Sequence, residues 1–304
     1  MKLAAVDIGS NAVRLLLCEV IEQTPQPIFK KIELVRVPIR LGEDVFTNQK
    51  VSEQKINRLI KAMKAFKLLI DVFECKGYKA CATAAMREAT NGADIIARVK
   101  KESDLTIEII DGHTEAKIIY ANHIAEELSN DFSYLYIDVG GGSTELTLFS
   151  NKEIIASRSF NIGTIRLLHD KVTKETWDEM KQWILKNING AKPLQAIGSG
   201  GNINKIYKLA YGKEIKPMSH KKIKEIADHI AEFSYEERIA KLGLNDDRAD
   251  VILPAAKIFL SVMKTAAIEK ILVPQSGLSD GLIHVLYEKI MKEKEGMFLE
   301  NEIK

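Results

Sequence analysis

The sequence of 304 residues is poor in cysteine and has no long apolar run. Its three cysteines, Cys18, Cys75 and Cys81, show no CxxC spacing and no paired framework, which argues against a disulfide scaffold and favours free thiols in a reducing cytoplasm. No stretch approaches the roughly 18 apolar residues of a membrane span. Asp7 interrupts the first apolar run, so we expect neither a signal peptide nor a membrane partner.

The chain also lacks a strong charge of one sign, since its formal net charge is only +2. Bulk binding to a DNA or RNA polymer is therefore not expected. The sequence contains no GxxxxGK[ST] loop and no GxSxG elbow, which argues against a P-loop enzyme and a serine hydrolase. The six histidines are scattered, and none lies at ligand spacing from a cysteine or carboxylate, so we expect no zinc site.

Two segments, one in each half of the chain, share one motif. In each, a strand ends in Asp, and a glycine-rich turn leads into a second strand. The aspartates are Asp7 and Asp138. Glycines let such a turn expose consecutive backbone N–H groups, which form a concave anion site, and an aspartate at its lip suits a divalent cation bridging to phosphate. The predicted phosphate-binding residues are Asp7, Gly9, Ser10, Asn11, Arg14, Gly140, Gly141, Gly142, Ser143 and Thr144.

The pattern of apolar residues predicts an α/β protein in which three strands open each half and helices alternate with strands afterwards. A long amphipathic helix is expected after Ser52 and before Gly77. In the second half, Pro254 should kink a helix over Arg248–Ile268 or mark its true start. No linker rich in Pro, Ser or Gly separates the halves, which suggests a continuous hinge.

Several short motifs occur in one order along nearly the whole chain, and together they resemble the exopolyphosphatase/guanosine pentaphosphate phosphohydrolase (Ppx/GppA phosphatase) family. That family lies in the actin/Hsp70/sugar kinase superfamily. The resemblance implies two ribonuclease-H-like domains, each with a mixed five-stranded sheet, and an interdomain cleft. The first domain is expected to comprise residues 1–125 and a C-terminal helix at about 283–304. The second is expected to comprise residues 126–282. The motifs are Asp7–Asn11 with Arg14-Leu15, Arg40–Glu43, Ala82–Ala89, Ile109–Gly112 with Glu115-Ala116, Asp138–Glu145, Gly163 with Arg166-Leu167, and Gly198–Gly201.

The same resemblance implies a hydrolase that cleaves a terminal phosphoanhydride with Mg²⁺. By position, Glu115 matches the catalytic glutamate that activates water, and Arg87 matches a phosphate-facing arginine. Asp138 and Glu145 match carboxylates near the metal and the phosphate, and both are expected as metal ligands. The expected substrate is inorganic polyphosphate, with guanosine pentaphosphate as the alternative, because both present a terminal phosphoryl group.

Three departures from the family pattern change these expectations. Ala12 stands where the family usually has serine, so one hydroxyl contact to phosphate is lost. Thr114 stands where the family often has an acidic residue, which changes the charge beside Glu115. Longer relatives carry an additional helical module that helps to hold long polyphosphate, and the resemblance of this sequence does not include that module.

Some of these residues have simpler interpretations. Arg40 and Glu43 are explained equally well by a structural ion pair, and Gly198–Gly201 by a tight strand-to-helix turn without a ligand. The basic run Lys213–Lys224 is either a solvated face or a surface that attracts a polyanion. Two other functions also remain: an ATP-dependent kinase on the same superfamily fold, and a non-catalytic polyphosphate or nucleotide sensor. A homodimer is expected as a way to lengthen the basic surface.

Overall fold

We describe a computed structural model of the chain, covering residues 1–23, 26–120, 129–212, 214, 216–274 and 276–302. It is an α/β protein with two mixed sheets. The contacts divide the chain into two units: unit 1 comprises Met1–Ile39, Lys50–His123 and Gly277–Lys304, and unit 2 comprises Arg40–Gln49 and Ile124–Ser276. The domain boundary predicted between residues 125 and 126 lies outside the described residues.

Unit 1 is built on a five-stranded sheet of order β3-β2-β1-β4-β5. The first three strands form an antiparallel meander, and β4 and β5 run parallel to β1. β1 and β2 are buried along almost their full length, because they occupy the middle of the sheet. The strands are β1 Lys2–Ile8, β2 Ala12–Ile21, β3 Ile28–Pro38, β4 Gly77–Ala82 and β5 Glu108–Ile109.

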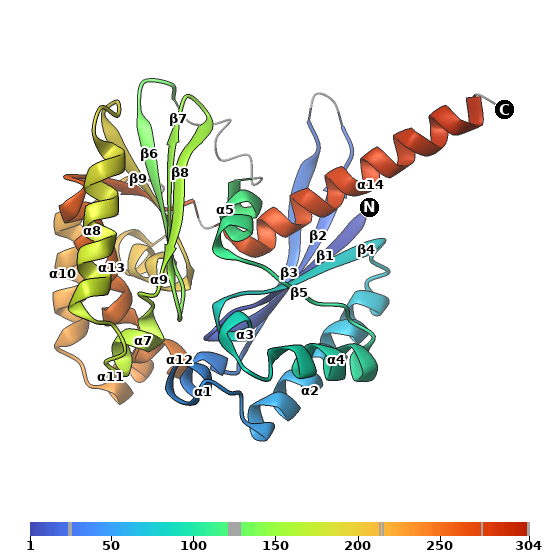
Figure 1. Cartoon of the computed structure of the whole chain (residues 1–304), viewed down its shortest axis with the longest axis horizontal. Coiled ribbons are helices and arrows are strands. Elements are labelled where there is room, and N and C mark those ends of the chain that lie inside the picture. The colour runs from blue at the N-terminus through green and yellow to red at the C-terminus, as the bar shows by residue number, and fades with distance from the viewer. Residues whose placement is uncertain (24–25, 121–128, 213, 215, 275, 303–304) are drawn as a thin grey trace. The chain divides into compact units, whose positions relative to one another are not determined.

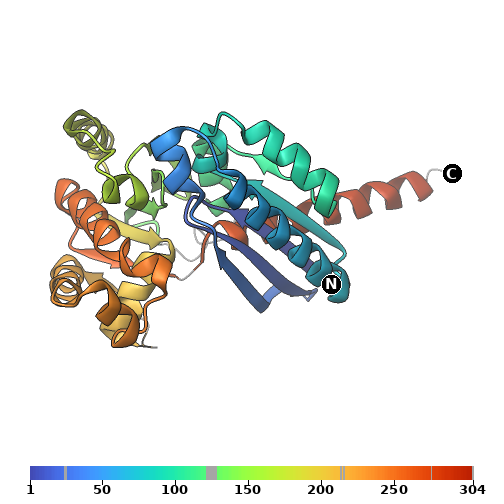
Figure 2. The same ribbon diagram turned by 90° about the horizontal axis from the view of Figure 1, so that it is seen from below.

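Helix α14 packs along β1, β2 and β4 and against α5, whereas α2 and α4 pack together on the other side of the sheet (Figures 1 and 2). Gly281 makes the close approach of α14 to α5 possible, since a Cβ there would lie 1.9 Å from the carbonyl oxygen of Ile118. The helix predicted between Ser52 and Gly77 is confirmed as α2. The helices are α2 Glu53–Val72, α3 Ala84–Glu88, α4 Gly92–Ser103, α5 Gly112–Tyr120 and α14 Leu278–Glu302.

Unit 2 has a six-stranded sheet of order β10-β11-β9-β6-β7-β8. The prediction of five strands was wrong here, because β10 adds a two-residue antiparallel pairing with β11. β10 lies in a lysine-rich segment and is too short to carry a strand period, although its Met218 is fully buried. The strands are β6 Ser133–Val139, β7 Thr144–Ser150, β8 Glu153–Phe160, β9 Leu194–Ser199, β10 Met218–Ser219 and β11 Lys270–Leu272.

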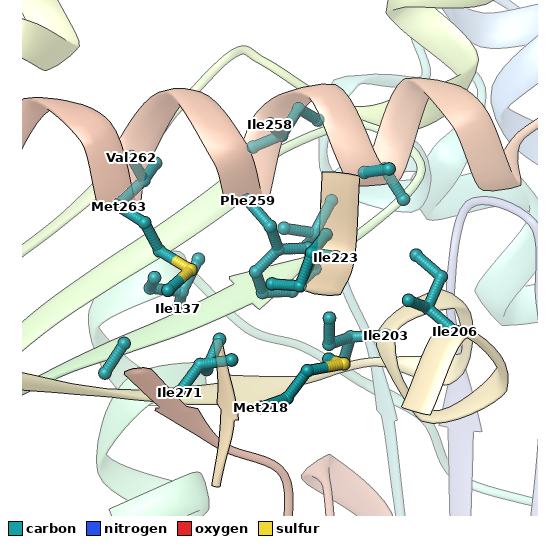
Figure 3. Packing of buried hydrophobic residues seen from close by; sticks show 14 of the residues in the cluster. Ile137, Ile203, Ile206, Met218, Ile223, Ile258, Phe259, Val262, Met263 and Ile271 are labelled. Atoms are coloured by element: carbon teal, nitrogen blue, oxygen red, sulfur yellow. The ribbon is translucent and has the colours of Figure 1, made fainter. Parts of the chain in front are cut away.

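The core of unit 2 lies between its sheet and the helices α9, α10 and α13. Phe259 and Met263 of α13 point toward Ile137 of β6 and Ile271 of β11 (Figure 3). α13 begins at Ile252, so Pro254 occupies its first turn, where a missing N–H costs little. The helices are α1 Leu41–Asn48, α7 Thr164–Leu168, α8 Lys174–Ile188, α9 Gly201–Tyr211, α10 His220–Ala231, α11 Tyr235–Ala240, α12 Asp246–Ala249 and α13 Ile252–Thr265.

Helix α1 was not predicted, and it groups with unit 2 although it follows β3 of unit 1. Its contacts are with α7, which lies more than a hundred residues later in the sequence. Across the described part of the chain, no helix is both long and apolar enough to cross a membrane.

Candidate active site

In unit 1, parallel strands bring three predicted residues to the same edge of the sheet. Asp7 lies near the carboxyl end of β1, Arg87 lies in α3 directly after β4, and Glu115 lies in α5 after β5. Because β1, β4 and β5 are parallel, their carboxyl ends face the same way. Polar groups gathered at this edge of an open α/β sheet commonly form a ligand site.

Asp7 and Arg14 are direct cross-strand partners on β1 and β2. The Arg14 guanidinium donates to the Asp7 carboxylate at 2.5 Å, and the Asp7 side chain is only 4% exposed. A buried carboxylate needs such a partner to offset its lost hydration. Arg14 was predicted to bind phosphate, and in the structure its guanidinium neutralises Asp7.

The turn between β1 and β2 is closed by a hydrogen bond from the N–H of Gly9 to the carbonyl of Ala12, with a length of 3.1 Å. The carbonyl of Ile8 accepts from the N–H of Thr83, which ties the turn to the end of β4. Ser10 is buried and Asn11 is half-buried within this turn. The predicted loop of unit 1 is therefore a compact turn held against the neighbouring strand.

The helix that carries Glu115 is fixed at its start by Asp111 and Arg87. A carboxylate oxygen of Asp111 accepts the N–H of Thr114 at 2.7 Å, and this bond holds the pKa of Asp111 below its usual range. Arg87 donates to the carbonyl of Ile110 at 2.8 Å. Glu115 lies in the first turn of α5 with 9% of its surface exposed, so a largely buried carboxylate sits on an anchored helix.

The thiol of Cys81 lies beside Asp7, because the two residues are neighbours on β4 and β1. Burial raises its pKa to about 12, and the negative charges of Asp7 and Glu115 raise it as well. The thiol therefore stays protonated at neutral pH, and a cysteine thiolate is not available as a nucleophile at this edge.

In unit 2, Asp138 and Glu145 occupy the positions that Asp7 and Arg14 occupy in unit 1. They are direct cross-strand partners on β6 and β7, so their side chains share one face of the sheet. Ser159, the next residue in the same row, donates its hydroxyl to Glu145 at 2.7 Å. Glu145 is only 3% exposed. Unit 2 thus presents two neighbouring carboxylates where unit 1 has an acid–base pair.

The glycine-rich turn of unit 2 is held by α7 through its carbonyl groups. The N–H of Thr164 donates to Gly140 at 3.0 Å, and the N–H of Ile165 donates to Gly141 at 2.9 Å. The side chain of Arg166 donates to the carbonyl of Gly142 at 2.6 Å. Consecutive glycine carbonyls therefore all point toward α7.

The backbone N–H groups that follow these glycine carbonyls must point away from α7. In a planar trans peptide, the C=O of one residue is antiparallel to the N–H of the next. The N–H groups of Gly141, Gly142 and Ser143 are consequently turned away from α7, and within the described residues none of them donates to a backbone carbonyl. Such a run of aligned donors is suited to binding an anion.

Two further predicted segments border this turn. Thr144 is fully buried, and its hydroxyl donates to the carbonyl of Ile162 at 2.5 Å, which supports the end of the turn. Gly200, directly before α9, has a φ of 111°, and a Cβ there would lie 3.1 Å from the carbonyl oxygen of Val139 and 3.5 Å from the Asp138 carboxylate. The start of α9 therefore packs directly on Asp138.

Other candidates form ordinary ion pairs. Arg40 contacts Glu43 at 2.5 Å and Asp250 at 2.6 Å, which fits the structural interpretation of that motif. In the basic run after residue 213, Lys216 and Lys224 pair with carboxylates of their own segment. These pairs reduce the positive charge that the run presents to solvent.

The carboxylates of unit 2 suit a magnesium ion. Mg²⁺ is usually held by one or two carboxylates and completes its shell with water and substrate phosphates. Asp138 and Glu145 supply such a pair beside the aligned N–H groups. Searched over the described residues, the chain has no cluster of three or more His, Cys, Asp or Glu side chains suited to a metal. The donor set thus fits an ion shared with substrate.

Comparison with known proteins places the chain in a family. A family model described as the Ppx/GppA phosphatase family matches residues 19–290. The chain belongs to this family. The resemblance inferred from the ordered motifs is therefore confirmed, and members of the family are phosphoanhydride hydrolases, the enzyme class that those motifs predicted.

Similar proteins from other organisms differ in length. A bifunctional 3-dehydroquinate synthase/phosphatase of Fusobacterium nucleatum is 30% identical over 94% of this chain. The chain spans about half of that protein, 46% of its length. A putative exopolyphosphatase of Haemophilus influenzae is 22% identical and is matched over 94% of this chain and 91% of its own length.

Solved structures share the fold. A Ppx/GppA family member from Aquifex aeolicus has 28% sequence identity and a TM-score of 0.73, over 96% of this chain and 98% of that chain. An exopolyphosphatase from Cytophaga hutchinsonii has 23% identity and a TM-score of 0.81, over 95% and 98% respectively, and this likeness concerns the fold alone. The actin-like, ribonuclease-H-like fold expected from the sequence is confirmed, with sheets of five and six strands.

Sequence reasoning missed the groups that hold the turn of unit 2. Gly163 and Arg166 belonged to a recognised motif but had no assigned role, and Ser159 was not singled out. A Cβ at Gly163 would lie 2.3 Å from the carbonyl oxygen of Gly141, so only glycine allows α7 to pack this closely. The available signal was the position of this motif directly after the third strand of the unit.

Proposed function

We propose that the chain is an exopolyphosphatase that releases orthophosphate from the end of inorganic polyphosphate. The observation that carries the proposal is the aligned set of N–H groups from Gly141 to Ser143 beside the carboxylate pair Asp138 and Glu145. Membership of the Ppx/GppA phosphatase family and similarity to proteins named exopolyphosphatase support it. The interdomain cleft expected from the resemblance stays a prediction.

In this proposal the residues of unit 2 hold the terminal phosphate. The N–H groups of Gly141, Gly142 and Ser143 donate to its oxygens, as aligned backbone donors do for anions. Asp138 and Glu145 would hold a magnesium ion, which would supply positive charge to offset the charge of the phosphate oxygens.

Residues of unit 1 act on the attacking water in this proposal. Glu115 accepts a proton from the water, whose oxygen forms a bond to the terminal phosphorus. The bridging P–O bond breaks, and the shortened chain leaves with the bridging oxygen. Arg87 uses one N–H to bind the carbonyl of Ile110, and its remaining donors are suited to a phosphate oxygen. The products are orthophosphate and a chain shorter by one phosphate.

Orthophosphate release tests this function directly. Long polyphosphate, short polyphosphate, guanosine pentaphosphate and ATP are offered in parallel with Mg²⁺. We expect release from polyphosphate, and a fall of about 10²- to 10⁴-fold in kcat for Glu115→Gln, because general base catalysis contributes about that much. Glu288→Gln, an exposed residue of α14 in the same unit, is the matched control and should leave kcat unchanged.

The other outcomes separate the alternatives. Release from guanosine pentaphosphate alone would assign the 5′-phosphohydrolase activity, and transfer from ATP to an acceptor would indicate a kinase. Binding of polyphosphate without release from any substrate would contradict the enzyme and support a sensor.

We also propose that the enzyme uses Mg²⁺, acts in the cytoplasm and forms a homodimer. The oxygen donors of Asp138 and Glu145 support the ion, and three free thiols support a reducing compartment. Light scattering after size exclusion tests the dimer, which requires an interface of roughly 1,000 Å² or more. A monomeric mass at micromolar concentration would contradict it.

A further inference from the structure

Arg166 contacts the glycine-rich turn of unit 2 through its charged side chain. Its Nε atom donates to the carbonyl of Gly142 at 2.6 Å, and the residue is only 9% exposed. Charge-assisted hydrogen bonds of this kind are short and stronger than neutral ones. The Gly142 carbonyl fixes the peptide plane that ends in the N–H of Ser143.

The guanidinium of Arg166 lies over the ring of Phe46, with its central carbon 4.0 Å from the ring centroid. Phe46 belongs to α1 and is 8% exposed, so the ring forms a buried platform for the cation. A desolvated cation–π contact is worth about 2 kcal/mol or more. The ring thus restricts the side chain that holds the turn.

The position of Phe46 is itself fixed within unit 2. α1 contacts α7, and Arg40 at the start of α1 forms an ion pair with Asp250 at 2.6 Å. This explains why residues 40–49 group with unit 2 although the chain on both sides of them belongs to unit 1. Helix α1 supports the arginine, and the arginine supports the turn.

We propose that Arg166 is a positioning residue for the phosphate-binding turn, and that Phe46 of α1 acts through it. The catalytic consequence of this inference rests on the proposed function. The structural consequence does not, because the hydrogen bonds between the turn and α7 can be measured by amide exchange without substrate.

The first test combines kinetics with a double-mutant cycle. Arg166→Met removes the donor and keeps a long apolar stem, and we expect kcat to fall about 10- to 100-fold, the range that a misplaced binding group causes. Phe46→Leu should lower kcat about threefold, and Phe46→Tyr, which keeps the ring, should lower it less. Because Phe46 acts through Arg166, the double variant Arg166→Met/Phe46→Leu should resemble Arg166→Met alone.

Arg158→Met is the matched control for this cycle. Arg158 also lies over an aromatic ring of unit 2, that of Phe160 at 5.1 Å, but it does not contact the turn. It should leave kcat within about twofold of the wild type. Independent, multiplicative effects of the Arg166 and Phe46 substitutions would overturn the role assigned to Phe46.

The second test is amide hydrogen exchange, which needs no activity. The N–H groups of Gly140, Thr164 and Ile165 donate hydrogen bonds within the turn or from α7 to the turn. Arg166→Met should therefore speed their exchange about tenfold, while the N–H groups of α8 keep their protection. Unchanged exchange and unchanged kcat, with only a lower melting temperature, would make Arg166 a purely structural residue and overturn the inference. If the wild type hydrolyses nothing but exchange responds as expected, the proposed function fails and the positioning role stands.

Discussion

The two units carry the same turn with opposite electrostatics. In unit 1, Asp7 faces Arg14 across the strands, and the acid is neutralised within the sheet. In unit 2, Asp138 faces Glu145, so the same pair of positions holds two carboxylates. The two turns have thus diverged: the pair of positions holds an ion pair in unit 1 and two carboxylates in unit 2. The proposed base, Glu115, lies on α5 of unit 1.

The turns also differ in what holds them. Both are closed in the same way, by an N–H of the first glycine that donates to a carbonyl three residues later, at 3.1 Å for Gly9 and 2.9 Å for Gly140. Only the turn of unit 2 has its glycine carbonyls fixed by the first residues of a helix, among the described residues. Fixed carbonyls mean fixed N–H donors, which is the preorganisation that binding a phosphoryl group requires.

Changing the carboxylate pair should have the largest effect. Glu145→Gln keeps an acceptor for Ser159 but removes one charge, and we expect kcat/KM to fall about 100-fold, as for removal of one preorganised electrostatic group. Steady-state kinetics at fixed Mg²⁺ measures this. Glu153→Gln, an exposed position on the neighbouring strand β8, is the control. Equal activity of Glu145→Gln and the control would remove Glu145 from the site.

The packing of α7 should give the next largest effect. Gly163→Ala places a Cβ 2.4 Å from the carbonyl carbon of Gly142, and such overpacking costs about 1–3 kcal/mol of unfolding free energy or more. Gly9→Ala and Gly140→Ala each place a Cβ 3.2 Å from a backbone oxygen and should cost less. Denaturant unfolding compares the three. If Gly163→Ala lowered the free energy of unfolding least of the three, the close packing of Gly163 on the turn would be contradicted.

Removing the counter-ion of unit 1 should have a moderate effect on stability. Arg14→Met leaves the buried Asp7 carboxylate without its cross-strand cation, which should cost about 1–3 kcal/mol of unfolding free energy. The double substitution Asp7→Asn/Arg14→Met should be milder than Arg14→Met, because neither charge is then left alone. A double variant less stable than both single variants would show that the pair is not the source of the effect.

The cap of α5 should give the smallest effect. Asp111→Ala removes the acceptor for the N–H of Thr114 and should cost about 1 kcal/mol, whereas Asp111→Asn should cost less. The pKa of Asp111 is lower in the folded chain. Its stabilisation is therefore fully present above the unfolded value of about 3.9 and is lost as pH falls through the lower folded value. Unfolding of wild type and Asp111→Asn from pH 7 to pH 2 measures this, and identical profiles would contradict it.

Local sequence signals were sufficient for much of the fold and for the turns. The Asp-glycine pattern at residues 7 and 138 predicted both turns, and the apolar period after Ser52 predicted α2. The partner of each aspartate could also have been predicted, because Arg14 and Glu145 follow Asp7 and Asp138 at the same distance across a tight turn. Hairpin register then places each pair side by side.

Contacts between distant segments were not predictable in this way. The bond from Arg166 to Gly142 and the stacking of Arg166 on Phe46 depend on where α7 and α1 pack, and no local period encodes that. β10 is likewise defined only by its partner β11, since two residues cannot show an alternation. The bond from the hydroxyl of Thr144 to the carbonyl of Ile162 was not predictable for the same reason, because Ile162 lies on another segment.

The division of roles between the units is tested most directly by Mg²⁺ activation curves of two variants. We predict that Glu145→Gln shifts half-activation to a Mg²⁺ concentration about tenfold higher or more, as loss of a charged ligand does. Glu115→Gln should lower kcat without moving the midpoint, since it acts on water. A shift of the midpoint in Glu115→Gln, or an unmoved midpoint in Glu145→Gln, would contradict the account.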